Sequence, residues 1–100
     1  GVDQESVPGS FSLKQNYPNP FNPTTTISYN LPEHTYFKLT IYNMLGDVIK
    51  DISSVSENNG FGRVKWNATS NQGKPVSAGV YLYSIEAGEF RQTKKMVLLK

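Results

Sequence analysis

The segment Val80–Leu99 has the sequence VYLYSIEAGEFRQTKKMVLL. In its first half, a set of apolar side chains alternates with a mixed set that includes Ser84 and Glu86. This is the two-residue period of a β-strand with one buried face. The apolar side chains that share this face are Tyr81, Tyr83, Ile85 and Ala87. Gly88-Glu89 then predicts a two-residue hairpin loop, and Arg91–Leu99 predicts the final strand. We therefore expect two antiparallel strands at the C-terminal end of the chain.

The same alternation recurs upstream at short intervals, and no segment shows a sustained helical period. Further strands are predicted at Thr24–Leu31, Phe37–Tyr42, Asp47–Ser53 and Gly62–Trp66. Gly46 closes a predicted type I turn in the left-handed conformation, and Trp66 is expected in the core beside the alternating tyrosines. At 100 residues, this pattern predicts an all-β fold, an immunoglobulin-like antiparallel β-sandwich of about seven short strands.

The N-terminal part of the chain has a different composition. Residues 1–10 are polar and include Pro8, Gly9 and Ser10, so we predict a flexible linker, followed by one folded domain over residues 11–100. A short edge strand at Phe11–Leu13 precedes three prolines, which exclude a helix or a central strand. This segment is predicted to be a stiff, extended crossing, with Tyr17 and Phe21 packed over one end of the sandwich.

Charge and composition exclude several classes of function. Ten basic and eight acidic residues leave a net charge of +2, which is too weak a bias to argue for nucleic-acid binding. No apolar run approaches the roughly 20 residues that a membrane helix needs, so membrane insertion is not expected. The chain has no cysteine and one histidine, His34, which we expect at the surface. With no catalytic motif in the sequence, neither an enzyme nor a cofactor is predicted.

One loop has a faint resemblance to a calcium-binding loop. Asn67, Thr69 and Asn71 alternate as oxygen-bearing side chains ahead of Gly73. Because the loop contains no carboxylate, and Ca²⁺ prefers charged oxygen ligands, a hydrogen-bonded turn is the favoured interpretation.

The tyrosines have a second possible role, since flat rings can stack on sugars. The candidates for carbohydrate binding are Tyr36, Tyr42, Tyr81 and Tyr83. Their alternation along predicted strands favours core packing over an exposed binding surface.

Four blocks of sequence, in order, resemble one protein family. The first, Leu13–Ile27, contains Asn16, Tyr17, Pro18, Asn19, Pro20, Phe21, Asn22 and Pro23. The second is Phe37–Gly46, with Ile41-Tyr42-Asn43 before Leu45-Gly46. The third is Trp66, a polar loop and then Ser77-Ala78-Gly79-Val80-Tyr81, and the last is Lys95–Lys100. Together they resemble the type A C-terminal sorting domain of the type IX (Por) secretion system. The pattern is also similar to the immunoglobulin-like domain of the flagellar hook-capping protein.

This resemblance implies a signal for transport and no catalytic activity. It implies partners in the type IX secretion machinery, a sortase, and a cargo domain upstream of residues 1–10. It also implies passage through the periplasm to the cell surface or the extracellular space. Two departures concern turns: Ala78 separates Ser77 from Gly79, and the loop after Trp66 lacks the aspartates that relatives often have.

The final strand is the predicted recognition element, bound by strand addition through its backbone and alternate side chains. Its residues are Lys94, Lys95, Met96, Val97, Leu98, Leu99 and Lys100. Cleavage is expected in the linker at Pro8, Gly9 and Ser10, where a protease can reach the backbone. Exposed edge strands predict a monomer or a weak dimer. The alternative function is a structural or carbohydrate-binding immunoglobulin-like module of a large surface enzyme.

Overall fold

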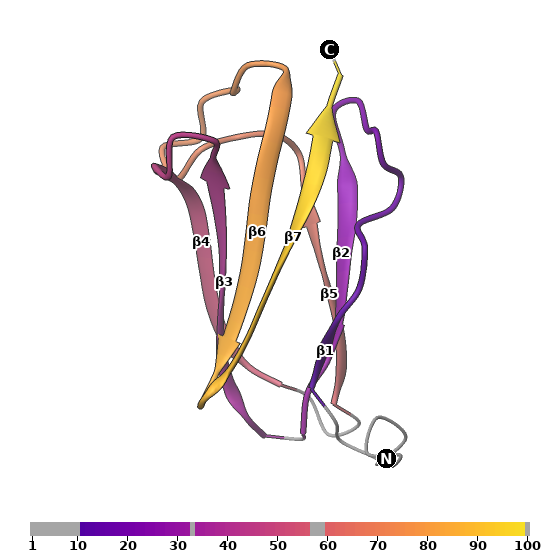
Figure 1. Cartoon of the computed structure of the whole chain (residues 1–100), viewed down its shortest axis with the longest axis vertical. Helices are drawn as coiled ribbons and strands as arrows, with labels where there is room; N and C mark the ends of the chain where they lie inside the picture. Colours follow the sequence, from indigo (N-terminus) through magenta and orange to yellow (C-terminus); the bar gives the residue numbers. More distant parts are fainter. Residues whose placement is uncertain (1–10, 33, 57–59, 100) are drawn as a thin grey trace.

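The computed structural model describes residues 11–32, 34–56 and 60–99, and these residues form two antiparallel sheets packed face to face (Figure 1). The strands are β1 (Ser12–Leu13), β2 (Thr25–Asn30), β3 (Tyr36–Asn43), β4 (Val48–Val55), β5 (Phe61–Trp66), β6 (Gly79–Ala87) and β7 (Phe90–Leu98). One sheet has the order β1-β2-β5 and the other β4-β3-β6-β7. The predicted all-β sandwich of seven strands is confirmed. No helix of the described residues is long and apolar enough to cross a membrane.

Two predicted turns adopt the expected geometry. The register of β6 and β7 runs from Gly79 opposite Leu98 to Ala87 opposite Phe90, which leaves Gly88-Glu89 as the hairpin loop. Between β3 and β4, the Gly46 amide donates to the Asn43 carbonyl at 3.0 Å, and Gly46 has a φ of 92°. That conformation is costly for a residue with a Cβ atom, which explains the glycine.

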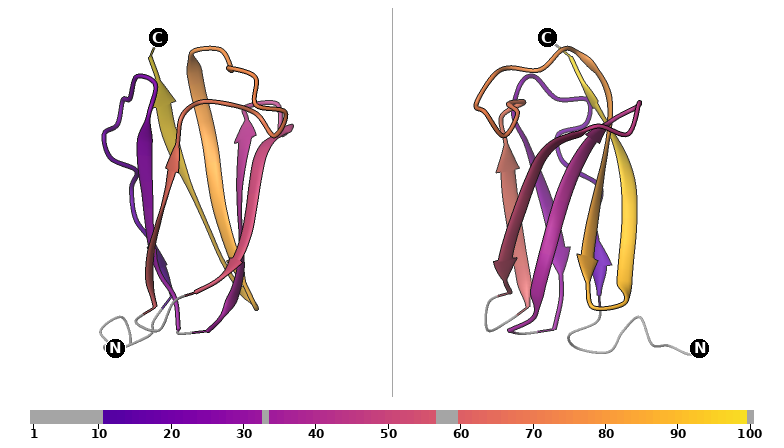
Figure 2. Two further views of the ribbon diagram at one scale, coloured as in Figure 1. Left: turned by 180° about the vertical axis from the view of Figure 1, so that it is seen from behind. Right: turned by 90° about the vertical axis from the view of Figure 1, so that its left-hand side faces the viewer.

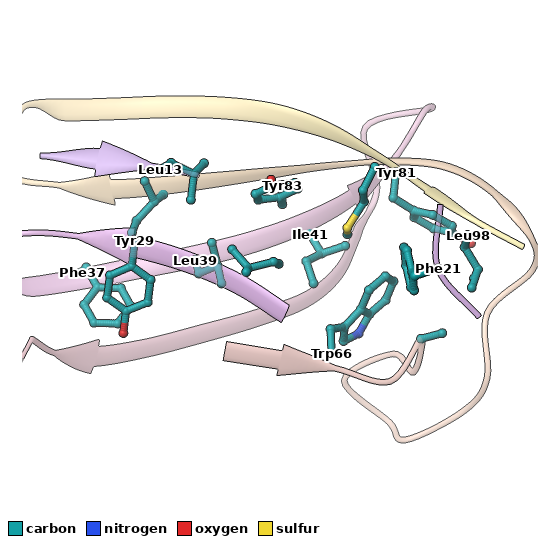
Figure 3. Close-up of a cluster of buried hydrophobic side chains, with 14 of the residues drawn as sticks. Leu13, Phe21, Tyr29, Phe37, Leu39, Ile41, Trp66, Tyr81, Tyr83 and Leu98 are labelled. Carbon is teal, nitrogen blue, oxygen red and sulfur yellow. The ribbon is translucent and has the colours of Figure 1, made fainter. Parts of the chain in front are cut away.

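The core fills the space between the two sheets (Figure 3). The fully buried side chains come from alternate positions of β2, β3 and β6, and include Ile27, Leu39, Ile41, Tyr83 and Ile85. Trp66, at the end of β5, is 1% exposed, as the sequence predicts. The inner faces of β2, β3 and β6 therefore follow the two-residue period of the sequence.

The proline-rich segment crosses from one sheet to the other (Figure 2). Tyr17 pairs with Thr26 beside β2, and Phe21 forms a parallel bridge with Leu98 at the end of β7. The peptide bonds before Pro18, Pro20 and Pro23 are cis.

The prediction that both aromatic rings of this segment pack over the sandwich is half right. Phe21 is 2% exposed, but Tyr17 is 80% exposed. Tyr17 is bonded to Thr26, and because directly paired residues share a face of a sheet, its ring points outward with the Thr26 side chain.

Candidate functional site

The predicted recognition strand β7 presents only part of its side chains. Lys95 and Leu99 are exposed, and Lys94 and Val97 are half-buried. Met96 and Leu98 are 0% and 1% exposed, because alternate residues of β7 face the core. A partner that binds the folded domain therefore cannot contact Met96 or Leu98, which corrects their place in the predicted recognition element. Lys100, like Pro8, Gly9 and Ser10, lies outside the described residues.

The outer edge of β7 is covered by the N-terminal segment. The Gln15 side-chain amide donates to the Lys95 carbonyl at 2.8 Å, and the Val97 amide donates to Asn19 Oδ1 at 3.0 Å. The Phe21 amide donates to the Val97 carbonyl at 3.0 Å, and the Leu99 amide donates to the Phe21 carbonyl at 2.8 Å. Strand addition along this half of β7 would first require displacement of residues 15–21.

Asn16 stabilises the conformation of residues 15–21, the segment that covers β7. It is 2% exposed, and its side-chain nitrogen donates to Thr25 Oγ1 at 2.9 Å and to the Pro18 carbonyl at 3.1 Å. Its side-chain oxygen accepts a bond from Gln15 at 2.7 Å. Since a buried amide without partners is costly, this network favours a single conformation of the segment. Asn16 and Asn19 were both predicted as structural residues from their motif, whereas a role for Gln15 was not predicted; the run of amides around the prolines is the available signal.

Tyr83 ties the same segment to the opposite sheet. Its hydroxyl donates to the Lys14 carbonyl and accepts a bond from the Asn16 amide, both at 2.8 Å. Burial raises the pKa of Tyr83 to about 12, although the bond from Asn16 acts in the opposite direction. Burial also raises the pKa of Tyr81, whose hydroxyl donates to the Ser77 carbonyl at 2.5 Å. Both tyrosines are thus packed in the core, as the alternation in the sequence favours, and the alternative sugar-stacking role is ruled out for these two.

An aromatic cluster lies beneath the C-terminal end of β7 (Figure 3). The Trp66 ring lies between Phe21, at a centroid distance of 5.9 Å, and Tyr81, at 5.6 Å and in an edge-on geometry. Trp66 Nε1 donates to the Thr69 carbonyl at 2.8 Å, so the one polar atom of the indole is satisfied. The cluster connects the first and third sequence blocks, and the bridge between Phe21 and Leu98 joins the fourth block to it at the same end of the sandwich.

The second sequence block reaches the same end through the β3–β4 turn. The turn lines a pocket of about 480 Å³ together with residues 75–81. Asn43 Oδ1 accepts bonds from the Leu45 and Asp47 amides, both at 2.9 Å, which stiffen the turn. Met44 and Leu45 are 61% and 87% exposed, so this rigid tip presents two apolar side chains to solvent. This exposure was not predicted from the sequence.

The candidate calcium loop uses its oxygen atoms internally. Thr69 donates to Asn67 Oδ1 at 2.6 Å, whereas Asn71 Oδ1 accepts a bond from the Asp51 amide on β4 at 3.2 Å. The side chains therefore do not converge on one point. Across residues 11–32, 34–56 and 60–99, no group of three or more metal-ligating acidic or histidine residues is close enough to hold an ion.

The remaining tyrosine candidates lie on the four-stranded sheet. Tyr36 is 62% exposed, and Tyr42 is half-buried. His34 is exposed, as predicted.

Comparison with protein families gives one match over most of the chain. The model of the secretion system C-terminal sorting domain matches residues 15–99. No curated protein matches the chain.

Two solved structures from Porphyromonas gingivalis share the fold. Dimeric latent PorU superposes with a TM-score of 0.71 and 21% identity, over 85% of this chain and 9% of its own. PorZ, an essential bacterial surface component of the type-IX secretion system, superposes with a TM-score of 0.62 and 23% identity, over 90% of this chain and 11% of its own. The chain thus spans about a tenth of each protein, and at this identity the likeness concerns the fold.

Proposed function

Because the chain belongs to the family of secretion-system C-terminal sorting domains, we propose that it directs an exported cargo protein to the outer-membrane translocon of the type IX system. In this role it is a non-catalytic signal, carried behind the cargo to the cell surface or the extracellular space. A surface sortase then removes it by cleavage near Pro8, Gly9 and Ser10, in the segment whose composition predicts a linker.

The observation that carries this proposal is the convergence of four sequence blocks on one end of the sandwich. Phe21, Trp66 and Tyr81 form one aromatic cluster, Leu98 lies beside Phe21, and the β3–β4 turn lines a pocket that Tyr81 shares. The other end holds Phe11, whose ring stacks on Phe90 at 4.8 Å. As β7 is about 30 Å long, the C-terminal strand ends far from the point where a preceding cargo would join.

Recognition is proposed to use the side chains of the C-terminal strand that point outward at this end. Lys95 and Leu99 are the exposed members. The β3–β4 turn, which carries the exposed Met44 and Leu45, lies at the same end of the sandwich as the end of β7 (Figure 1). The backbone edge of the strand is occupied, so contact through these side chains replaces the strand addition expected from the sequence. A rigid, ordered surface lowers the entropic cost of binding.

The test is a secretion assay in a bacterium that has the type IX system. The chain is fused behind a signal peptide and a folded reporter, with and without the paired substitutions Lys95→Glu and Leu99→Ser. Both side chains are exposed, so the domain stays folded, with stability changed by less than about 0.5 kcal/mol for each substitution. We expect the unsubstituted fusion at the cell surface and the substituted one in the periplasm.

The matched control carries Lys38→Glu and Tyr36→Ser, an equivalent exposed pair on β3. This control should reach the surface. Equal export of all three fusions would contradict recognition through the C-terminal strand, and retention of all three would contradict the sorting role. Deletion of residues 95–100 is unsuitable, since it removes the buried Met96 and Leu98 and confounds recognition with folding.

A further inference from the structure

The outer face of the three-stranded sheet carries a regular array of side chains. Strand pairing arranges them in three rows: Ser12–Asn30–Phe61, Lys14–Ser28–Arg63 and Tyr17–Thr26–Lys65. The intervening residues, such as Ile27 and Tyr29, are buried. Because successive residues of a strand point to opposite faces, the three rows point away from the core.

This face concentrates positive charge. Lys14, Arg63 and Lys65 are exposed, and none of them forms an ion pair with another described residue. The sequence has no acidic residue in the ranges 11–32 and 60–85, which contain the whole three-stranded sheet. The acidic residues of the described ranges lie on the other sheet and its turns: Asp47, Asp51, Glu86 and Glu89. The three-stranded sheet therefore presents three exposed cations and no acidic residue, whereas the four-stranded sheet mixes its acidic residues with basic ones: Lys38, Lys50, Arg91, Lys94 and Lys95.

Aromatic and hydroxyl groups accompany the cations. Tyr17 and Phe61, which are 80% and 59% exposed, stand at opposite corners of the array. Ser28 and Thr26 supply hydroxyl groups in the central strand. A shallow pocket of about 530 Å³ opens among Lys14, Ser28, Tyr29, Phe61, Gly62 and Arg63. The face thus combines charge, rings and hydrogen-bonding groups on one surface.

The size of the face limits what it can bind. β2 and β5 are six residues long. With the segment beside β2 included, three chains about 4.8 Å apart over that length span an area of roughly 200–300 Å². A stable interface with a globular protein buries about 800 Å² on each partner. The face is too small for such a partner alone, but it suits a narrow chain that lies along β2 and β5.

We propose that this face binds an acidic polysaccharide, a sugar chain that bears carboxylate or phosphate groups. The three cations attract its charged groups, the Tyr17 and Phe61 rings stack on its sugar rings, and Ser28 and Thr26 bond to its hydroxyl groups. The rings and hydroxyl groups favour a sugar chain over an acidic peptide. This binding is a second activity beside the sorting role and does not depend on recognition of the C-terminal strand.

The experiment measures binding of the purified 100-residue chain by calorimetry at low ionic strength. The probes are carboxymethyl dextran and phosphorylated dextran, compared with neutral dextran and with polyglutamate. We expect at least one acidic dextran to bind at least tenfold more tightly than both comparison polymers. Raised salt should weaken the binding, because the charges are exposed.

Variants locate the site. Arg63→Gln with Lys65→Gln should weaken binding of the acidic dextran at least tenfold, and Tyr17→Ala at least threefold. The matched control, Lys38→Gln with Lys50→Gln, removes two charges from the other sheet and should change affinity less than twofold.

Four results would overturn the proposal: no binding of either acidic dextran, equal binding of neutral dextran, equal binding of polyglutamate, or equal loss in the control variant. Circular dichroism of each variant confirms that the sandwich remains folded.

Discussion

The two edges of the four-stranded sheet are covered to different extents. The edge at β7 is closed by backbone and side-chain bonds from Gln15, Asn19 and Phe21. The edge at β4 has no neighbouring strand in its sheet; Asn71 bonds to Ile49 and Asp51 near its start, and Val48 and Val55 at its ends are 51% and 50% exposed. This less covered edge is called the open edge below. This difference indicates that the first sequence block stabilises the last one. The side-chain amides of Gln15 and Asn19 and the buried ring of Phe21 hold β7 in place.

The open edge has its own protection against uncontrolled pairing. Lys50 and Asp51 place charges within β4, and a bulge interrupts its register with β3 between Ile41 and Tyr42. Charges and bulges both discourage edge-to-edge association. If the domain forms the weak dimer that its sequence predicts, we expect contact through β4, because the C-terminal half of β7 is occupied.

The largest expected effect comes from removing the ring that anchors the closed edge. Phe21→Ala deletes a side chain that is 2% exposed and in contact with Trp66. We expect the free energy of unfolding to fall by about 3–5 kcal/mol, as is usual for a fully buried phenylalanine. Urea denaturation measures it.

The corresponding substitution at the open edge is Val55→Ala. It should lower the free energy of unfolding by less than about 1 kcal/mol, because the side chain is half exposed. Similar losses at the two edges would contradict the contrast between them.

The strands and turns could be predicted from the sequence because the patterns that specify them are local. Alternation in Val80–Ala87 and the Gly88-Glu89 loop specify a hairpin without reference to the rest of the chain. Tyr17 and Phe21 were harder, since both are aromatic residues among prolines. Their opposite environments depend on pairing with Thr26 and Leu98, which lie 9 and 77 positions away. Such contacts are not visible in a local pattern.

The candidate recognition strand also depends on long-range contacts that a local pattern does not reveal, but part of its arrangement could have been predicted. Lys95–Lys100 was identified as one element through its motif, but its alternation already separates Met96 and Leu98 from Lys95 and Val97. The two-residue period could therefore have shown which side chains share a face. That β7 is covered on its outer edge could not be inferred, because the donors and acceptors lie some 80 residues upstream.

An intermediate effect is expected at the link between the closed edge and the opposite sheet. Tyr83→Phe removes the hydroxyl that bonds to Lys14 and Asn16, and leaves a buried amide without its partner. We expect the free energy of unfolding at neutral pH to fall by about 1–2 kcal/mol, as measured by urea denaturation. An undiminished stability would mean that Tyr83 does not tie the segment to β6.

The same variant has a signature at high pH. Since the pKa of Tyr83 is raised from its ordinary value of 10.0 to about 12 in the folded state, its protonated form favours folding. This contribution is complete below pH 10 and is lost as the pH rises through 12, at about 1.4 kcal/mol per pH unit in between. Stability of the parent chain should therefore fall more steeply between pH 10 and 12 than that of Tyr83→Phe. Parallel pH profiles would contradict the assignment.

The smallest effect is expected from Tyr17→Ala, although Tyr17 lies in the same segment as Phe21. Its ring is 80% exposed, and its two bonds to Thr26 are made by the backbone, which the substitution leaves intact. We expect the free energy of unfolding to change by less than about 0.5 kcal/mol. The double variant Tyr17→Ala with Phe21→Ala should be as stable as Phe21→Ala alone, within the same margin. Thermal unfolding followed by circular dichroism tests both. A loss comparable to that of Phe21→Ala would mean that the Tyr17 ring packs on the sandwich, and would remove the exposed ring on which the proposed polysaccharide face depends.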